Sequence, residues 1–402
     1  WYTRAGQIGK WDSEDWEDPL HADVEFRRGD FFDLKDLNLS RSDTLAAVIK
    51  VYQYWIALSD CDGFRIDTVK HLPWEASRNF CGAIHEYAES IGKENFLLLG
   101  EVTGGAGMAR NYIEIFGRNI DAVLDIGEPT TKLAGMVKGL TPPNQFFRQF
   151  GGHDELGSHR ETGRYHVSIL DDHDMVGRSG KHRFSANNNI DSRYIQVAHA
   201  VGVQLTTLGI PCVYYGTEQA FDGTESRHDH TIESKLNFED RYIRESMFGG
   251  TFGAFETAGC HFFNQDHPSY LRIAAIAIIR NGQNAIGIAL RRGRQYLRET
   301  SVNANSFAIP GAGEIIAWSR ILFNQEVLVV LNSNGVASQA AEITVDAFLH
   351  QVGSPMKVLY RSDWSDAELK NPPSNQTVEV MANQSRATVR MQLPPAGMAI
   401  LA

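Results

Sequence analysis

The chain has 402 residues, of which 43% are hydrophobic and 22% are charged, so it is too apolar for a disordered protein and long enough for several domains. It has no apolar run of the roughly 20 residues that span a bilayer, and its net charge of −11 argues against nucleic acid as the main ligand. We therefore expect a globular protein whose partners are neither membranes nor nucleic acids.

The predicted elements begin with an irregular stretch over residues 1–41, followed by a helix over 42–58. Short apolar strands then alternate with longer helical stretches. The predicted strands are 63–67, 96–100, 121–126, 166–170 and 211–215, and the helices that follow them lie near 74–91, 109–116, 129–138, 191–208 and 268–280. This alternation predicts an α/β fold with a parallel sheet and crossover helices.

Ionisable residues cluster at the carboxyl ends of these strands, among them Arg65, Asp67 and Glu101. Active sites of (β/α)8 barrels are built on that face of the sheet. A doubly wound sheet would instead bind its ligand at one switch point, and we find no glycine-rich phosphate loop that favours it. The pattern therefore predicts a (β/α)8 barrel.

Residues 300–402 have a different pattern, in which apolar and polar residues alternate over short runs separated by turn residues. That pattern is typical of an antiparallel β-sandwich. We therefore divide the chain into an irregular excursion over 1–41, a barrel over 42–295 and a C-terminal β-sandwich over 296–402.

Two of the ionisable residues lie in the segment from Asp62 to His71. Arg65 and Asp67 are two positions apart on a strand and so point to the same face. A cation beside a carboxylate keeps it ionised, as a nucleophile requires. The alternative interpretation is an ion pair inside the barrel without a catalytic task.

Two further carboxylates stand at strand ends. Glu101 ends an apolar strand, where partial burial favours the protonated form that a general acid needs; the alternative is a capping glutamate that faces water. Asp174 ends the cluster Asp171-Asp172-His173-Asp174, for which a metal site or a helix N-terminus is the alternative.

Taken together, these segments resemble the short motifs of the α-amylase superfamily of retaining glycoside hydrolases. The segments are 63–71, 100–102 and 172–174, each at a strand end, with 209–218 similar to that family's eighth-strand segment. Residues 29–38 resemble the end of its domain B, and 300–402 resemble its C-terminal domain.

The resemblance implies a role for each matching position. Asp67 corresponds to the nucleophile, Glu101 to the general acid/base and Asp174 to the carboxylate that stabilises the transition state. The implied substrate-binding residues are Arg65, which orients the nucleophile, His173 in the subsite of the cleaved sugar, and Lys70 and His71 on the acceptor side.

The resemblance also indicates what the chain does not show. The family's motif on its third strand, an Asp near an Asn-His pair, has no counterpart here, so we count strands four to eight and expect a preceding part of the native protein. In calcium-dependent members the backbone carbonyl of the position of His71 is a ligand. The acidic residues Asp30, Asp33 and Asp36 are further oxygen candidates for calcium, and no organic cofactor is expected.

We expect hydrolysis of α-1,4-linked glucans or maltooligosaccharides. The alternatives are a transglycosylase or glucosyl isomerase of the same family and, from another class, a catalytically silent glycan-binding scaffold. The long polar segment from Glu218 to His267 is expected to wall the substrate cleft, with Arg227 or His228 as candidate contacts. Compartment and oligomeric state are not predicted.

Overall fold

The chain is divided into two compact units, one of residues 1–126 with 152–167 and one of 127–151 with 168–402, each described by itself. The predicted domain borders at 41/42 and 295/296 stay predictions. The computed structural model describes residues 1–11, 25–103, 108–109, 112–113, 120–124, 128–150, 163, 165–175, 182–186, 188–223, 243–248, 262–302 and 305–402.

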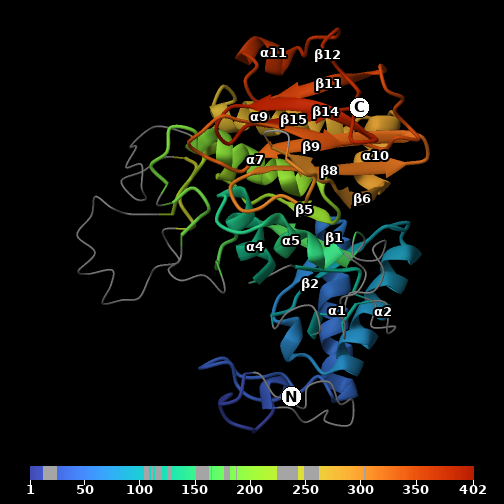
Figure 1. The fold of residues 1–402 in the computed structure, drawn as a ribbon. Helices are drawn as coiled ribbons and strands as arrows, with labels where there is room; N and C mark the ends of the chain where they lie inside the picture. The colour runs from blue at the N-terminus through green and yellow to red at the C-terminus, as the bar shows by residue number, and fades with distance from the viewer. Residues whose placement is uncertain are drawn as a thin grey trace. The chain divides into compact units, whose positions relative to one another are not determined.

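The parallel sheet begins in the first unit with β1 (Gly63–Ile66), β2 (Leu97–Glu101) and β3 (Ala122–Leu124) (Figure 1). The strands β4 (His166–Ile169) and β5 (Ile210–Cys212) follow, and the sheet order is β1-β2-β3-β4-β5. Neighbours in chain order are therefore neighbours in the sheet, as in the successive strand–helix units of a barrel. The parallel pairing of β1 with β2, β2 with β3 and β3 with β4 confirms the predicted strand type. Their numbering as strands four to eight of a barrel stays a prediction.

Helices α1 (Ser42–Ser59) and α2 (Trp74–Ser90) accompany this sheet and contact each other. Both match their predicted spans, because their apolar residues recur at helical spacing. Helix α1 ends where Asp60 adopts the left-handed conformation at φ 55°. Ile56, Ile84 and Leu98, from α1, α2 and β2, are fully buried in the core of this unit. The predicted helix near 109–116 lies mostly outside the described residues.

The described residues among 1–41 are irregular, as predicted. They contain the 3-10 helix η2 (Glu25–Arg27) and isolated bridges such as Tyr2 with Leu37. A second 3-10 helix, η3 (Val69–His71), follows β1. The interpretation of residues 1–41 as the end of a domain B stays a prediction.

The second unit contains a layer of helices. Their bounds are α4 (Glu128–Val137), α5 (Pro143–Phe147), η5 (Arg148–Phe150), α7 (Arg193–Thr206), η6 (Thr217–Gln219), α9 (Pro268–Asn281) and α10 (Ala285–Arg292). Helix α7 is buried from Gln196 to Thr206 and contacts α9 and α10. Helices α5 and α10 were not predicted from the sequence, and both are shorter than the helices that were predicted.

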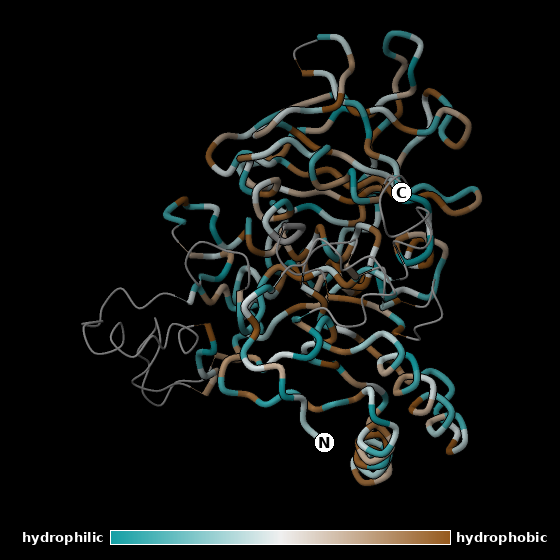
Figure 2. The backbone as a smooth tube through the Cα atoms, turned by 90° about the horizontal axis from the view of Figure 1, so that it is seen from below, coloured by the Kyte–Doolittle hydropathy of each residue, from teal (hydrophilic) through white to brown (hydrophobic). Residues whose placement is uncertain are grey.

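The C-terminal strands of this unit form two antiparallel sheets. One has the order β13 (Met381–Asn383), β14 (Arg386–Leu393), β10 (Gln339–Thr344) and β7 (Thr300–Ser301). The other has the order β12 (Thr377–Glu379), β11 (Pro355–Arg361), β15 (Met398–Leu401), β9 (Gln325–Asn332), β8 (Ile315–Leu322) and β6 (Arg294–Leu297). The short helix α11 (Asp366–Lys370) follows β11. One continuous hydrophobic core includes residues of both sheets and of the helices, and the alternating hydropathy along the chain can be followed in Figure 2. The predicted antiparallel β-structure is confirmed.

A buried histidine ties the helical layer to the larger of these sheets. His199 of α7 lies with Nδ1 against the backbone oxygen of Ala396 and with Nε2 2.8 Å from the hydroxyl of Tyr360 on β11. Its side chain is fully buried, and this burial lowers the pKa of His199 to about 3. The imidazole is therefore neutral in the folded protein at neutral pH.

In the part of the chain that the structure describes, no single helix has the length and apolar character to cross a membrane. Helices α9 and α10 reach that length only together, and they meet at 97°.

Candidate functional site

Three charged side chains meet where β1 and β2 end. The guanidinium of Arg65 donates from Nη1 to Oδ1 of Asp67 at 2.6 Å and from Nη2 to Oε2 of Glu101 at 2.6 Å. Ile66, the last residue of β1, pairs with Gly100, so Asp67 follows directly after β1 and Glu101 is the last residue of the neighbouring strand β2. One cation thus brings together two of the three predicted catalytic carboxylates.

The two carboxylates differ in exposure. The side chain of Asp67 is 63% exposed, whereas that of Glu101 is 12% exposed. Since Arg65 contacts both, its charge does not distinguish them, and the described difference between them is one of exposure.

The backbone around β1 explains why these residues reach this place. A Cβ on Gly63 would lie 2.5 Å from the backbone oxygen of Leu97, so glycine permits the close approach of β1 to β2. After Asp67 the chain turns through Thr68, which has φ 52°, into η3. Asp67 is thereby left at the point where the strand ends.

Lys70 and His71 lie on η3 in surroundings that are largely apolar. The ammonium of Lys70 is 5.2 Å from the ring centre of Phe26, and the Nδ1 of His71 is 2.6 Å from the backbone oxygen of Phe26. Burial lowers the pKa of His71, and the nearby charge of Lys70 acts in the same direction. The assignment of these two residues to the acceptor side stays a prediction.

The predicted cluster after β4 divides into structural and accessible residues. Asp171 is buried and accepts hydrogen bonds from the backbone N–H of Phe184 and the hydroxyl of Thr217. Asp172 accepts from the backbone N–H of Asp174 at 2.6 Å, which fixes the turn. His173 and Asp174 are 42% and 33% exposed, and the Nε2 of His173 lies 3.2 Å from Oδ2 of Asp174.

The contact of Asp174 with Arg244 was missed by sequence reasoning. The Nη2 of Arg244 lies 2.6 Å from Oδ1 of Asp174. The only signal in the sequence is that Arg244 belongs to the long polar segment between β5 and α9. The candidates named from that segment, Arg227 and His228, lie outside the described residues.

Asp67 and Glu101 belong to the first unit, whereas His173 and Asp174 belong to the second. The joint catalytic role of the three carboxylates stays a prediction.

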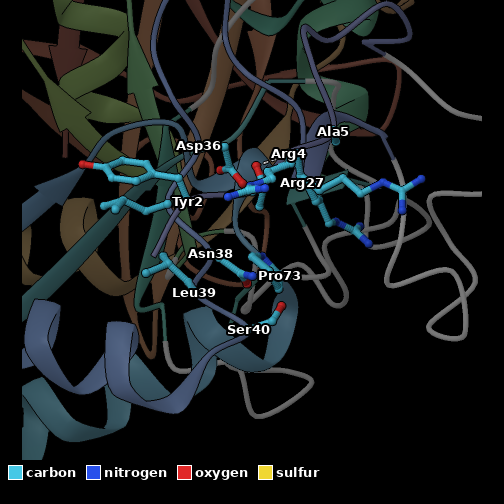
Figure 3. Close-up of a pocket in the computed structure, with 12 residues that line it drawn as sticks. Tyr2, Arg4, Ala5, Arg27, Asp36, Asn38, Leu39, Ser40 and Pro73 are labelled. Carbon is cyan, nitrogen blue, oxygen red and sulfur yellow. Dashed lines mark hydrogen bonds between the residues drawn. The ribbon is translucent and has the colours of Figure 1, made fainter.

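A cavity of about 590 Å³ lies in the first unit near the predicted calcium candidates, with Arg4, Arg27, Asp36 and Asn38 among its lining residues (Figure 3). Burial raises the pKa of Asp36 to about 6 and outweighs a hydrogen bond from Thr3. Arg65, Asp67 and Glu101 do not line this cavity.

Two of the predicted oxygen candidates for calcium, Asp30 and Asp33, differ in their surroundings. The carboxylate of Asp30 is already bound by Lys35 and by the backbone N–H of Asp36, and Asp33 is exposed. Within the described ranges no group of three or more His, Cys, Asp or Glu side chains gathers as a metal centre would. The calcium site expected at the backbone carbonyl of His71, with Asp30, Asp33 and Asp36 as further oxygen candidates, stays a prediction.

A family model described as the alpha-amylase catalytic domain matches residues 10–248. An alpha-amylase of Streptomyces lividans is 27% identical over 377 residues, which cover 92% of this chain and 38% of that protein. A cyclomaltodextrin glucanotransferase of Klebsiella oxytoca is 25% identical over 347 residues, which cover 77% of this chain and 49% of that protein. The chain thus spans about half or less of the length of these curated relatives.

Solved structures show the same fold. An Anoxybacillus alpha-amylase has a TM-score of 0.64 at 20% identity, covering 100% of this chain and 70% of that chain. The cyclomaltodextrin glucanotransferase CldA has a TM-score of 0.67 at 18% identity, covering 100% of this chain and 66% of that chain. The match supports a fold of barrel and C-terminal antiparallel sheets.

Proposed function

Because the chain belongs to the alpha-amylase family, we propose that it contributes the catalytic carboxylates of a retaining glycoside hydrolase that cleaves α-1,4-linked glucans or maltooligosaccharides. The observation that carries the proposal is the single guanidinium of Arg65 that contacts both Asp67 and Glu101. Retention requires two carboxyl groups close together, about 5–5.5 Å apart, and neighbouring strand ends supply that proximity.

The first step assigns one bond change to each carboxyl group. An oxygen of Asp67 attacks the anomeric carbon while the bond from that carbon to the glycosidic oxygen breaks. Glu101 transfers its proton to the departing oxygen, so the leaving sugar departs as a neutral alcohol. The product on the protein is a glycosyl ester of Asp67.

The second step reverses these roles. Glu101, now ionised, takes a proton from water as the water oxygen attacks the anomeric carbon, and the ester bond to Asp67 breaks. Asp174 and His173 are proposed to bind hydroxyl groups of the sugar, because both are accessible from solvent. An ionised carboxylate also stabilises the positive charge that develops on the sugar in the transition state.

Transfer to a sugar is the alternative outcome of the same intermediate. A hydroxyl group of an acceptor sugar then replaces water, and Glu101 takes the proton from it. The relatives include both an alpha-amylase and a cyclomaltodextrin glucanotransferase, so this alternative is retained. A silent scaffold is less well supported, because the three carboxylates at the positions of the catalytic motifs are present.

Calcium has no step in this proposal, and a calcium site that includes the backbone carbonyl of His71 stays a prediction.

The test uses the full-length protein and maltotriose. Glucose and maltose as products indicate hydrolysis, whereas maltotetraose and longer products indicate transfer. Asp67→Asn and Glu101→Gln should each lower kcat by at least roughly a thousandfold. Glu89→Gln, at an exposed position of α2, is the matched control and should retain wild-type activity.

A second readout tests the nucleophile directly. A 5-fluoro-α-glucosyl fluoride should form a stable ester on Asp67, detected by mass spectrometry of the peptide that contains residues 63–69. An active protein that labels at another carboxylate, or whose Glu101→Gln variant keeps wild-type kcat, would overturn the assignment.

A further inference from the structure

Arg244 makes two different contacts with the segment that carries Asp174. Its Nη2 lies 2.6 Å from Oδ1 of Asp174, and its Nε donates to the backbone oxygen of His173 at 2.9 Å. The other oxygen of the carboxylate, Oδ2, faces the imidazole of His173. Arg244 therefore contacts both the carboxylate and the backbone that carries it, which restricts the direction in which Asp174 points.

A buried ion pair in turn holds the backbone of Arg244. Glu245 is 2% exposed, and its Oε2 lies 3.0 Å from Nη2 of the buried Arg183. The same Nη2 donates to the backbone oxygen of Ile243 at 2.9 Å. Arg183 thus holds the residue before Arg244 and the residue after it.

The clamp formed by Arg183 and Glu245 is itself anchored to other parts of the second unit. Nη1 of Arg183 donates to the backbone oxygen of Tyr215 at 2.6 Å, and Oε1 of Glu245 accepts from the backbone N–H of Gly223 at 2.9 Å. The guanidinium carbon of Arg183 lies 4.5 Å from the ring centre of Tyr214. Side chains packed in this way have few alternative rotamers, so the position of Ile243–Glu245 is well determined.

The two ion pairs differ in solvent exposure. Arg183 and Glu245 are buried, whereas the side chains of Arg244 and Asp174 are 44% and 33% exposed. An exposed ion pair contributes little to stability. The burial of the clamp beneath an exposed Arg244 indicates that the arrangement serves the direction of the carboxylate.

We propose that Arg244 is a positioning residue for Asp174, and that the Arg183–Glu245 ion pair is the clamp that fixes the backbone position of Arg244. The inference rests on the proposed function, since it deepens the role of Asp174 in it. Arg244 holds one carboxylate oxygen so that the group presents a fixed direction to the sugar hydroxyls. Because a misdirected carboxylate loses contacts that strengthen in the transition state, kcat should fall more than KM rises.

The test compares Arg244→Ala and Arg244→Lys with the wild-type full-length protein on maltotriose. Arg244→Ala should lower kcat/KM roughly ten- to a hundredfold, mainly through kcat. Arg244→Lys should recover part of this loss, because it keeps the charge but cannot contact Asp174 and His173 with a planar fork. Added guanidinium ion should restore activity to Arg244→Ala and leave the wild type unchanged.

The matched control is Arg361→Ala, which removes an arginine that contacts Asp363 through Nε and Nη2 on the C-terminal sheet. It should retain wild-type kcat and KM. A fall in kcat without guanidinium rescue, or an Arg244→Ala variant with wild-type kcat/KM, would overturn the positioning role.

Glu245→Gln tests the clamp with little change in volume, since it removes the charge opposite Arg183. It should give the same kcat-dominated loss as Arg244→Ala, and the double variant should lose no more than either single variant. Additive losses would show that the clamp does not act through Arg244. A wild-type protein inactive on every glucan would instead contradict the proposed function, so the two failures are distinguishable.

Discussion

Replacement of the buried His199 by Gln should remove a specific part of the pH dependence of stability. In the folded protein the pKa of His199 is about 3, because its side chain is fully buried, whereas an unfolded chain has the ordinary value of about 6.5. Between these values the unfolded state binds one proton more, so the free energy of unfolding falls as the pH falls.

The size of the effect follows from those two values. Each pH unit below about 6.5 costs about 1.4 kcal/mol, so the wild type should lose about 2 kcal/mol through this residue between pH 8 and pH 5. His199→Gln should be less stable than the wild type at pH 8, because its contacts with Tyr360 and the backbone of Ala396 are disturbed. The difference between the two proteins should then shrink by about 2 kcal/mol on going to pH 5.

Urea unfolding at both pH values measures this, with tryptophan fluorescence as the signal. Trp318 is suited to report it, since it is fully buried in the core of the same unit and its indole N–H donates to the backbone oxygen of Thr206. Tyr360→Phe is the control, because it loses a hydrogen bond but keeps the buried imidazole and hence the wild-type slope. Parallel pH dependences of wild type and His199→Gln would refute the reasoning.

Three other substitutions follow from the structure. Arg65→Lys should lower kcat/KM at least tenfold without lowering the thermal midpoint by more than a few degrees, because an ammonium cannot reach Asp67 and Glu101 with the geometry of a guanidinium. Kinetics and thermal unfolding followed by circular dichroism measure the two quantities, and an unchanged kcat/KM would contradict the prediction. Gly63→Ala should cost about 1–3 kcal/mol by urea titration, since its Cβ would meet a backbone oxygen at 2.5 Å, whereas Gly311→Ala, with no contact below 3.5 Å, should be close to neutral. Glu326→Gln should cost about 3–5 kcal/mol at pH 7 in the same titration, and a near-neutral result would contradict the charge assigned to this buried group.

The reason for the last value lies in the surroundings of Glu326. Its burial raises the pKa, but a hydrogen bond with His350 and the charge of Arg298 outweigh that effect and lower the pKa to about 2. The stability that the ionised group contributes should therefore be present above about pH 4.5 and be lost as the pH falls toward 2. Removing the negative charge leaves Arg298 without the carboxylate that lies 2.6 Å from it.

The sequence predicted those parts of the fold that depend on local patterns. Helix α1 is long enough, and strand β2 apolar enough, for the sequence pattern to predict them. Their bounds agree with the prediction within about two residues. Helix α10 has only eight residues and the strand β7 only two, so neither contains enough periods to be recognised. Their conformation depends on packing against the C-terminal sheets and on pairing with β10.

The residues of the candidate site were likewise predicted only where a local sequence pattern marks them. Asp67 and Glu101 were found because each ends an apolar strand within a short motif. Asp171 belongs to an equally conspicuous cluster, yet it is buried and holds Phe184 and Thr217. Arg244 was missed because its role depends on Arg183, which is distant in sequence and comes beside it only in the folded protein.

The order of the strands in the larger C-terminal sheet has a consequence for biosynthesis. Strand β15 is the last of that sheet's strands to be made, yet it pairs with β9 on one side and with β11 on the other. Until β15 has been made, β9 and β11 therefore expose hydrogen-bonding edges with nothing between them, and such edges invite pairing with other chains. Completion of this sheet therefore waits for its last strand, so a frameshift or early stop that affects Met398–Leu401 should yield an aggregating product even though every residue of the β1–β2 site is intact.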